Sequence, residues 1–183
     1  KDTIKSLVTS AITTYNSDEL QEFDQMFRHS KFISTMNKVD TSILSNITTV
    51  KLHKSFTATT TAATTYTINL NNALYNPHSG HNATAGGILS SSAFTINGDV
   101  TNDYYLNDDG DGNVRIYYLS AGTKIYTNNT LGTVNYTTGQ IVLNALYITS
   151  VGDVDGATST DVRLTIIPNS VDTIPVRNQL LAI

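Results

Sequence analysis

The spacing of apolar residues changes from a helical to a strand period near residue 47, and this change most constrains the fold. From residue 4 to residue 15, apolar residues recur three or four positions apart, as on one face of an amphipathic helix. The residues of this face are Ile4, Leu7, Val8, Ala11, Ile12 and Tyr15. Asp2 is the expected cap of the helix, and Asn16 and Ser17 are its expected end.

A second helix is predicted from about Ser30, which would cap it, to Val39 and Asp40. Its apolar face comprises Phe32, Ile33 and Met36. Between the two helices, Leu20, Phe23 and Phe27 have a spacing that fits a helix, although an extended segment fits as well.

From about Ile47 onward, apolar and polar residues alternate, which is typical of half-buried strands. Strands are predicted at 50–53, 66–70, 94–96, 114–119, 133–136, 140–143, 146–148 and 162–167. Thr138 and Gly139 are the expected turn of a hairpin, and the Ser/Thr tract at 57–65 is an expected exposed crossover. The predicted fold is therefore α+β and mainly β: a helical arm at residues 1–45, then an antiparallel sheet or sandwich domain at 46–183. The linker candidate is 41–45.

The composition agrees with a β-rich chain and excludes several classes of function. Thr, Asn and Ser (29, 18 and 16 residues) together make up 63 of the 183 residues, and they suit pleated surfaces and turns. The net charge of −4 leaves no basic stripe for nucleic acid. No apolar run is long enough for a membrane span, no signal peptide is visible, and the absence of Cys excludes disulfides and thiolate sites. The start at Lys1 and the apolar end predict a fragment of a longer polypeptide.

Two loops contain residues that can bind metal ions, but neither loop has the full pattern of a metal site. An EF-hand reading that starts at Asp109 has Val114 at its sixth position and Ser120 at its twelfth, where Gly and Glu are needed. A solvated Asp-Gly turn between strands is the better interpretation of 107–113. His78 and His81 are three positions apart in the Gly-rich loop 76–87, but the usual zinc site has three or four protein ligands. We interpret them as free surface histidines, unless a symmetric oligomer brings pairs of such loops together.

No catalytic constellation stands out. A triad of Ser30, His29 and Asp24 can be drawn, but a Ser-rich chain supplies such combinations by chance. We interpret Glu19 and Glu22 as part of a solvated helix face rather than as the two catalytic carboxylates of a glycosidase. We therefore predict no enzyme activity, no cofactor, no metal and no small-molecule substrate.

Two stretches of the sequence resemble a known family. The first contains Phe27-Arg28-His29-Ser30-Lys31-Phe32 and Asp40-Thr41-Ser42-Ile43-Leu44-Ser45-Asn46, and the second is the end from Ile174-Pro175 to Ile183. Together they are similar to the C-terminal part of the large baseplate wedge protein of contractile-tailed (myovirus) bacteriophages. The hairpin at 132–141 resembles a turn module of phage tail proteins.

The resemblance implies a structural role in the virion. Such proteins form homodimers and join other wedge proteins in a ring around the tail hub, after assembly in the bacterial host cytoplasm. The residues expected in the arm core or in a subunit contact are Leu7, Ile12, Tyr15, Phe23, Phe27 and Phe32. The alternative is a receptor-binding or carbohydrate-binding β domain of a phage tail or cell surface, which would use the Tyr-rich strands and the two loops. Such a domain leaves the amphipathic arm unexplained.

Overall fold

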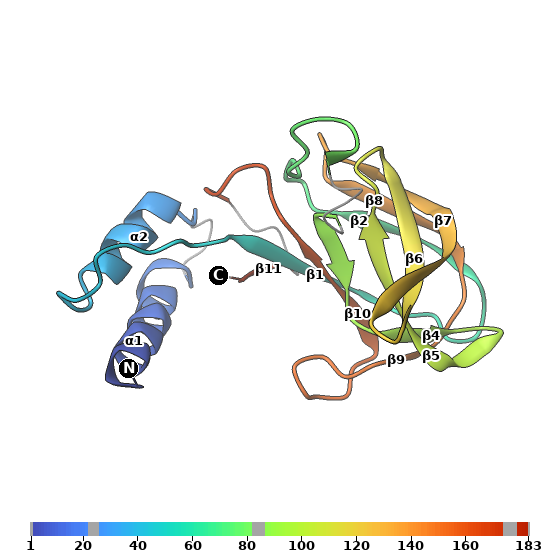
Figure 1. Cartoon of the computed structure of the whole chain (residues 1–183), viewed down its shortest axis with the longest axis horizontal. Coiled ribbons are helices and arrows are strands. Elements are labelled where there is room, and N and C mark those ends of the chain that lie inside the picture. The colour runs from blue at the N-terminus through green and yellow to red at the C-terminus, as the bar shows by residue number, and fades with distance from the viewer. Residues whose placement is uncertain (1, 22–25, 82–86, 174–178, 183) are drawn as a thin grey trace.

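The computed structural model describes residues 2–21, 26–81, 87–173 and 179–182. Two helices lie at one end of the molecule and a strongly curved antiparallel sheet lies at the other, so that the arm stands apart from the sheet (Figure 1). The long strand β1 (Lys51–Thr57) leads from the arm into the sheet. The predicted class, α+β and mainly β with an N-terminal helical part, is confirmed. The boundary at residue 45 stays a prediction.

Both predicted helices are present, with different ends. Helix α1 (Asp2–Glu19) begins at Asp2, whose role as a cap stays a prediction, and it continues to Glu19, so the predicted end at Asn16 and Ser17 is wrong. Helix α2 (His29–Asn37) begins at an N-cap position held by Arg28, with no side-chain cap, so the prediction of Ser30 as the cap is wrong. The backbone N–H of His29 instead donates to the carboxylate of Asp172 at 2.8 Å, so this amide is satisfied from the far end of the chain.

Within the described residues, the sheet contains eleven strands. After β1 these are β2 (Thr64–Asn69), β3 (Leu89–Ser91), β4 (Phe94–Ile96), β5 (Asp99–Asp108), β6 (Asn113–Ser120), β7 (Thr123–Asn135), β8 (Gln140–Leu146), β9 (Ile148–Val151), β10 (Asp161–Ile166) and β11 (Gln179–Ala182). Their order is β11-β1-β10-β3-β5-β6-β7-β8-β2, with β4 paired to β5 and β9. Segment 146–148, predicted as one strand, is interrupted at Tyr147 between β8 and β9.

The sheet curves almost into a barrel because segments beyond β2 and β10 pair with each other. Tyr75 donates its N–H to the carbonyl of Ile167 at 3.1 Å, and Asn169 donates to the carbonyl of Ala73 at 2.8 Å. Side chains that point inward from every second position fill the interior, and on β10 they are Val162, Leu164 and Ile166, all fully buried. This layout places the 76–81 and 109–113 loops at one end of the sheet and the arm beside β1.

The predicted hairpin is confirmed between β7 and β8. Gly139 has φ +70°, and its N–H donates to the carbonyl of Asn135 at 2.8 Å. A Cβ at Gly139 would lie 2.2 Å from the backbone oxygen of Asn72, so this position has no room for a side chain. The turn is therefore fixed both by its dihedral angle and by the close approach of the segment after β2.

The buried Tyr104 hydrogen-bonds to the start of β5, and its ionisation makes the stability of the folded state depend on pH. Its hydroxyl donates to the carboxylate of Asp99 at 2.9 Å. Burial, together with this hydrogen bond, raises the pKa of Tyr104 to about 12, from about 10 in an unfolded chain. Because the folded state holds the proton more tightly, the stabilisation is complete below pH ~10 and is lost as the pH rises towards ~12.

We expect Tyr104→Phe to lower the free energy of unfolding at neutral pH by about 1 kcal/mol, because one hydrogen bond is lost. The same variant should lose less stability than the wild type between about pH 10 and 12, because it lacks the phenol that ionises there. Urea unfolding followed by circular dichroism at several pH values measures both effects. Parallel stability curves for the two proteins would contradict the role of Tyr104.

Candidate subunit-contact site

An aromatic cluster holds the two helices of the arm together. Tyr15 of α1, Phe27 before α2 and Phe32 of α2 are all buried, and Phe27 is fully enclosed. The rings of Tyr15 and Phe32 meet edge to face, with centroids 5.2 Å apart, and Phe27 lies 5.7 Å from Phe32. Met36 and Val50 complete this small core. The arm thus has its own hydrophobic centre, separate from the interior of the sheet.

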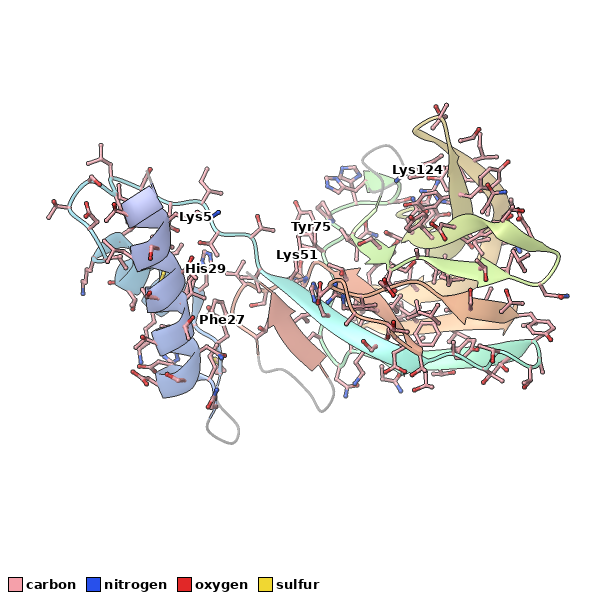
Figure 2. All side chains as sticks on the ribbon, turned by 90° about the horizontal axis from the view of Figure 1, so that it is seen from below. Lys5, Phe27, His29, Lys51, Tyr75 and Lys124 are labelled. Atoms are coloured by element: carbon pink, nitrogen blue, oxygen red, sulfur yellow. The ribbon has the colours of Figure 1, made fainter. Side chains whose placement is uncertain are left out.

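The arm is also tied to the end of the sheet domain by a short backbone pairing. Phe27 donates its N–H to the carbonyl of Thr173 at 2.9 Å, and Thr173 returns a hydrogen bond at 3.2 Å. The adjacent Asp172 carboxylate accepts from the N–H of His29. Figure 2 shows Phe27 and His29 on the side of the arm that faces the sheet. Residues more than 140 positions apart therefore fix where the arm begins its second helix.

A pocket of about 670 Å³ opens between the arm and the sheet. One wall is apolar and comes from the helices and the segment that follows them, with Val8, Ile12, Phe32, Met36, Ile43 and Ile47. The opposite wall comes from β1 and β10, with Lys51, His53, Arg163 and Thr165. The pocket thus combines an apolar side with a side that carries basic groups.

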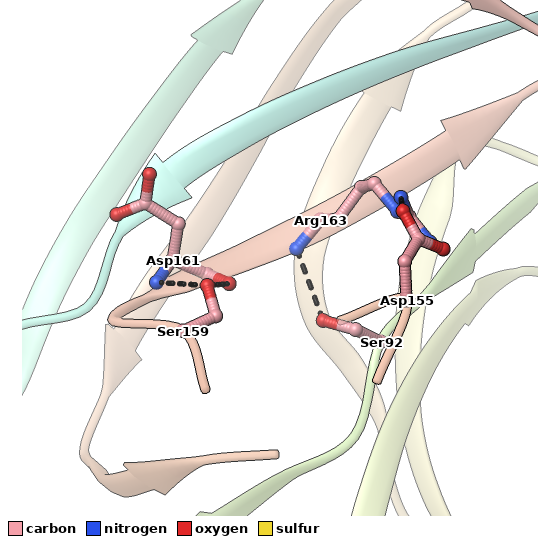
Figure 3. Close-up of polar contacts among 5 residues, drawn as sticks. All are labelled: Ser92, Asp155, Ser159, Asp161 and Arg163. Atoms are coloured by element: carbon pink, nitrogen blue, oxygen red, sulfur yellow. Dashed lines mark hydrogen bonds and ion pairs between the residues drawn. The ribbon is translucent and has the colours of Figure 1, made fainter. Parts of the chain in front are cut away.

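Arg163 is held in place at the sheet side of this pocket. Its guanidinium contacts the carboxylate of Asp155 through both oxygens, with Nη2 to Oδ1 at 2.8 Å, and this hydrogen bonding holds the pKa of Asp155 below its usual value. Its backbone N–H donates to the hydroxyl of Ser92 at 3.0 Å (Figure 3). Burial lowers the pKa of His53, and the charge of Arg163 adds to this effect, so the neutral imidazole is favoured.

The structure separates the expected contact residues into two groups. Tyr15, Phe27 and Phe32 lie in the core of the arm, whereas Leu7 and Ile12 are 42% and 38% exposed. Phe23 lies outside the described residues. The role of these residues in a subunit contact stays a prediction.

Two further apolar residues, which sequence reasoning did not single out, are almost fully exposed after the second helix. Leu44 is 93% exposed and Ile47 is 99% exposed. Both lie in the segment between α2 and β1, and Ile47 is at the rim of the pocket. The sequence signal for them was weak, because isolated apolar residues in a Ser- and Thr-rich segment have no periodicity.

The two composition-biased loops lie against each other. The N–H of Gly80 and the side-chain amide of Asn76 both donate to the carbonyl of Gly110, at 3.2 and 3.1 Å. Ser79 hydrogen-bonds to Asp111. Asp109 accepts from the backbone N–H groups of its own loop, so 109–112 is a turn between β5 and β6, as predicted.

One part of the acidic loop differs from the prediction of a solvated turn. Asn107 and Asp108 are 1% and 0% exposed, because β5 continues through them into the core. The carboxylate of Asp108 accepts from the N–H groups of Ile88 and Leu89 at 2.8 and 3.0 Å, and from the hydroxyl of Tyr136 at 2.7 Å. Burial, with this last hydrogen bond, raises the pKa of Tyr136 well above its usual value. Asp108 is therefore a structural residue of the sheet.

The triad of Ser30, His29 and Asp24 that the sequence allows lies partly outside the described residues. Nε2 of His29 lies 3.3 Å from the carbonyl oxygen of Thr48, and Asp24 is outside the described residues. Within the ranges that the structure describes, no group of three or more His, Cys, Asp or Glu side chains is placed to hold a metal ion. Neither described helix is long and apolar enough to cross a membrane. The most developed surface feature is thus the arm with its pocket and its exposed apolar residues.

A helical arm is joined to an antiparallel near-barrel, and apolar residues are exposed on the segment that connects them. Residues 1–55 match the family model described as baseplate structural protein gp6, C-terminal domain III. No curated protein matches the chain. The family match covers the arm and most of β1, and it confirms the similarity to the C-terminal part of a phage baseplate wedge protein. The match indicates a structural role in the virion, in the tail baseplate of a bacteriophage.

Proposed function

We propose that the arm, together with the segment between α2 and β1, is the surface through which the chain self-associates as a dimer and joins other wedge proteins in a ring around the tail hub, without enzymatic activity. The observation that carries this proposal is the exposure of Leu44 and Ile47, at 93% and 99%. Ile47 lines the pocket together with the partly exposed Ile12. Exposed apolar residues at a hollow are typical of protein contact surfaces.

The position of these residues favours contact with protein rather than coverage by the chain itself. The aromatic core of the arm is already closed by Tyr15, Phe27 and Phe32, so Leu44 and Ile47 have no space in it. The pocket beside Ile47 is lined by apolar side chains on the arm side, which a side chain of a second copy can fill. Burial of one isoleucine side chain contributes about 1.5–3 kcal/mol.

We expect Ile47→Glu to weaken self-association by at least about tenfold, because each 1.4 kcal/mol of lost binding is a factor of ten. The substitution should leave folding intact, since Ile47 is 99% exposed in one chain. The matched control is Val100→Glu, which places the same charge at a 71% exposed apolar position on β5. Light scattering over a range of concentrations measures the association of all three proteins.

Two results would contradict the proposal: a strictly monomeric wild type at high concentration, or equal association of the Ile47 and Val100 variants. Association of the wild type and of the Val100 variant, with loss in the Ile47 variant, would support it. Circular dichroism on each variant verifies that the fold is retained.

The alternative, a carbohydrate-binding domain, has one observation in its favour. Tyr105, Tyr117 and Tyr126 stand together on one face of β5, β6 and β7, with neighbouring centroids 5.7 and 5.5 Å apart. Side chains of the chain itself already cover two of these rings: Lys124 Nζ lies 4.8 Å from the centre of Tyr117, and Arg115 lies 4.5 Å from that of Tyr126. Because the covered rings offer less surface for stacking on a sugar, we favour the assembly role.

A further inference from the structure

Two histidine side chains that the baseplate role does not use meet at the tip of the 76–81 loop. Nδ1 of His81 lies 3.2 Å from Nε2 of His78, and the ring planes are almost perpendicular at 89°. The edge of the Tyr75 ring packs near His81, with centroids 5.5 Å apart and planes at 81°. The loop therefore brings two imidazole nitrogens into direct contact on the surface.

Hydrogen bonding indicates which nitrogen of His78 is free to bind a ligand. Its Nδ1 lies 3.0 Å from the carbonyl oxygen of Ser79, and a carbonyl can only accept, so Nδ1 of the neutral ring carries the proton. Nε2 then presents a lone pair towards His81. A ring N–H that donates to a backbone carbonyl is the usual second-shell support of a histidine that binds a metal through its other nitrogen.

The loop is held by hydrogen bonds of the residues between the two histidines and by the turn that these residues form. A tight turn is closed by the N–H of His81, which donates to the carbonyl of His78 at 3.1 Å. Ser79 bonds to Asp111, and Gly80 bonds to Gly110 of the neighbouring loop. Because these bonds anchor the backbone between the two histidines, the imidazoles are kept close without any ligand.

We propose that His78 and His81 form a two-histidine site for a divalent transition metal such as Zn²⁺. Two Zn–N bonds of 2.0–2.1 Å at a tetrahedral angle separate their nitrogens by about 3.3 Å. The observed 3.2 Å fits this separation, so the metal can replace the shared proton after small rotations of the rings. The His81 proton moves to Nε2 of the same ring, and both imidazoles stay neutral.

Imidazole nitrogen is a preferred ligand of zinc, copper and nickel, whereas calcium and magnesium take oxygen ligands. With two protein ligands, the remaining coordination positions are open to water. This proposal is independent of the assembly role of the arm, because the loop lies at the sheet and contains none of the arm residues.

The test uses the intact chain with ¹⁵N-labelled histidine and a titration with ZnCl₂, followed by correlation spectra of the ring nitrogens. We expect Nε2 of His78 and Nδ1 of His81 to shift, while the rings of His29 and His53 serve as internal references. His81→Ala should weaken zinc binding by about tenfold or more, as loss of one ligand of two requires. The control His29→Ala removes an imidazole on the arm and should keep the affinity of the wild type.

The proposal is overturned if zinc moves none of the ring signals, if all four histidines shift alike, or if His81→Ala binds zinc as the wild type does. His78→Ala provides a second variant, so that a local change of the loop in one variant does not decide the result. Circular dichroism establishes that both variants retain the sheet.

Discussion

Asp108→Ala is expected to lower the free energy of unfolding of the sheet domain by about 3–5 kcal/mol. The carboxylate accepts from two backbone N–H groups, those of Ile88 and Leu89, and from the hydroxyl of Tyr136. Alanine leaves these buried donors without this acceptor, and each such loss costs about 1–3 kcal/mol. Urea unfolding monitored by far-ultraviolet circular dichroism measures the change, which suits a chain without Trp.

Two comparisons make the measurement specific. Asp108→Asn keeps an oxygen for the two N–H groups and offers an N–H to the oxygen of Tyr136, so it should cost clearly less than alanine. Asp111→Ala removes an exposed carboxylate from the same acidic run and should change the free energy of unfolding by less than about 1 kcal/mol. Equal effects of Asp108→Ala and Asp111→Ala would show that the buried hydrogen bonds do not stabilise the domain.

The geometry around this carboxylate also explains a glycine. Gly87 has φ +86°, and a Cβ at this position would lie 2.1 Å from Oδ1 of Asp108. A side chain there would both strain the backbone and displace the carboxylate. The glycine is therefore part of the same structural unit as the acid 21 positions later.

The sequence was sufficient to predict the elements whose burial follows a period. Both helices and the strands around Tyr66, Ile68 and Val162 lie where apolar residues recur at the right spacing. The first half of β7, from Thr123 to Thr130, was missed because it is mostly exposed on both faces and so has no alternation. No range was predicted for β5 for a related reason, since its polar residues at the start and end conceal a strand of ten residues.

The contacts that define the candidate sites depend on pairs far apart in the chain, which no local pattern contains. Sequence reasoning assigned Tyr15, Ile12 and Phe27 to one set, as arm core or subunit contact, and could not separate the two roles. Only the packed structure separates Ile12, at 38% exposure, from the fully enclosed Phe27. Asp108 was predicted to be solvated because it begins a run of Asp and Gly. Its hydrogen-bond partner Tyr136 is 28 positions away, so no local pattern indicates the contact.

Phe27→Ala is expected to lower the stability of the helical arm by about 3–5 kcal/mol, the usual cost of removing a buried phenylalanine. Phe27 is fully buried, contacts the rings of Tyr15 and Phe32, and pairs through its backbone with Thr173. Its loss leaves a cavity in a small core that has few other large side chains. Amide hydrogen exchange resolves the effect by segment and should show faster exchange in α1 and α2.

The sheet amides should keep their protection in this variant, because the interior of the sheet is a separate cluster of buried residues. The matched control is Met26→Ala, which truncates the adjacent side chain at 42% exposure and should leave the exchange of both helices almost unchanged. Loss of protection across the whole sheet would show instead that the arm and the sheet unfold as one cooperative unit. If the arm alone opens and self-association is lost with it, the proposed contact surface requires the folded arm. The structural reason is that Leu7 and Ile12 lie on the same helix as Tyr15, whose ring packs against Phe27.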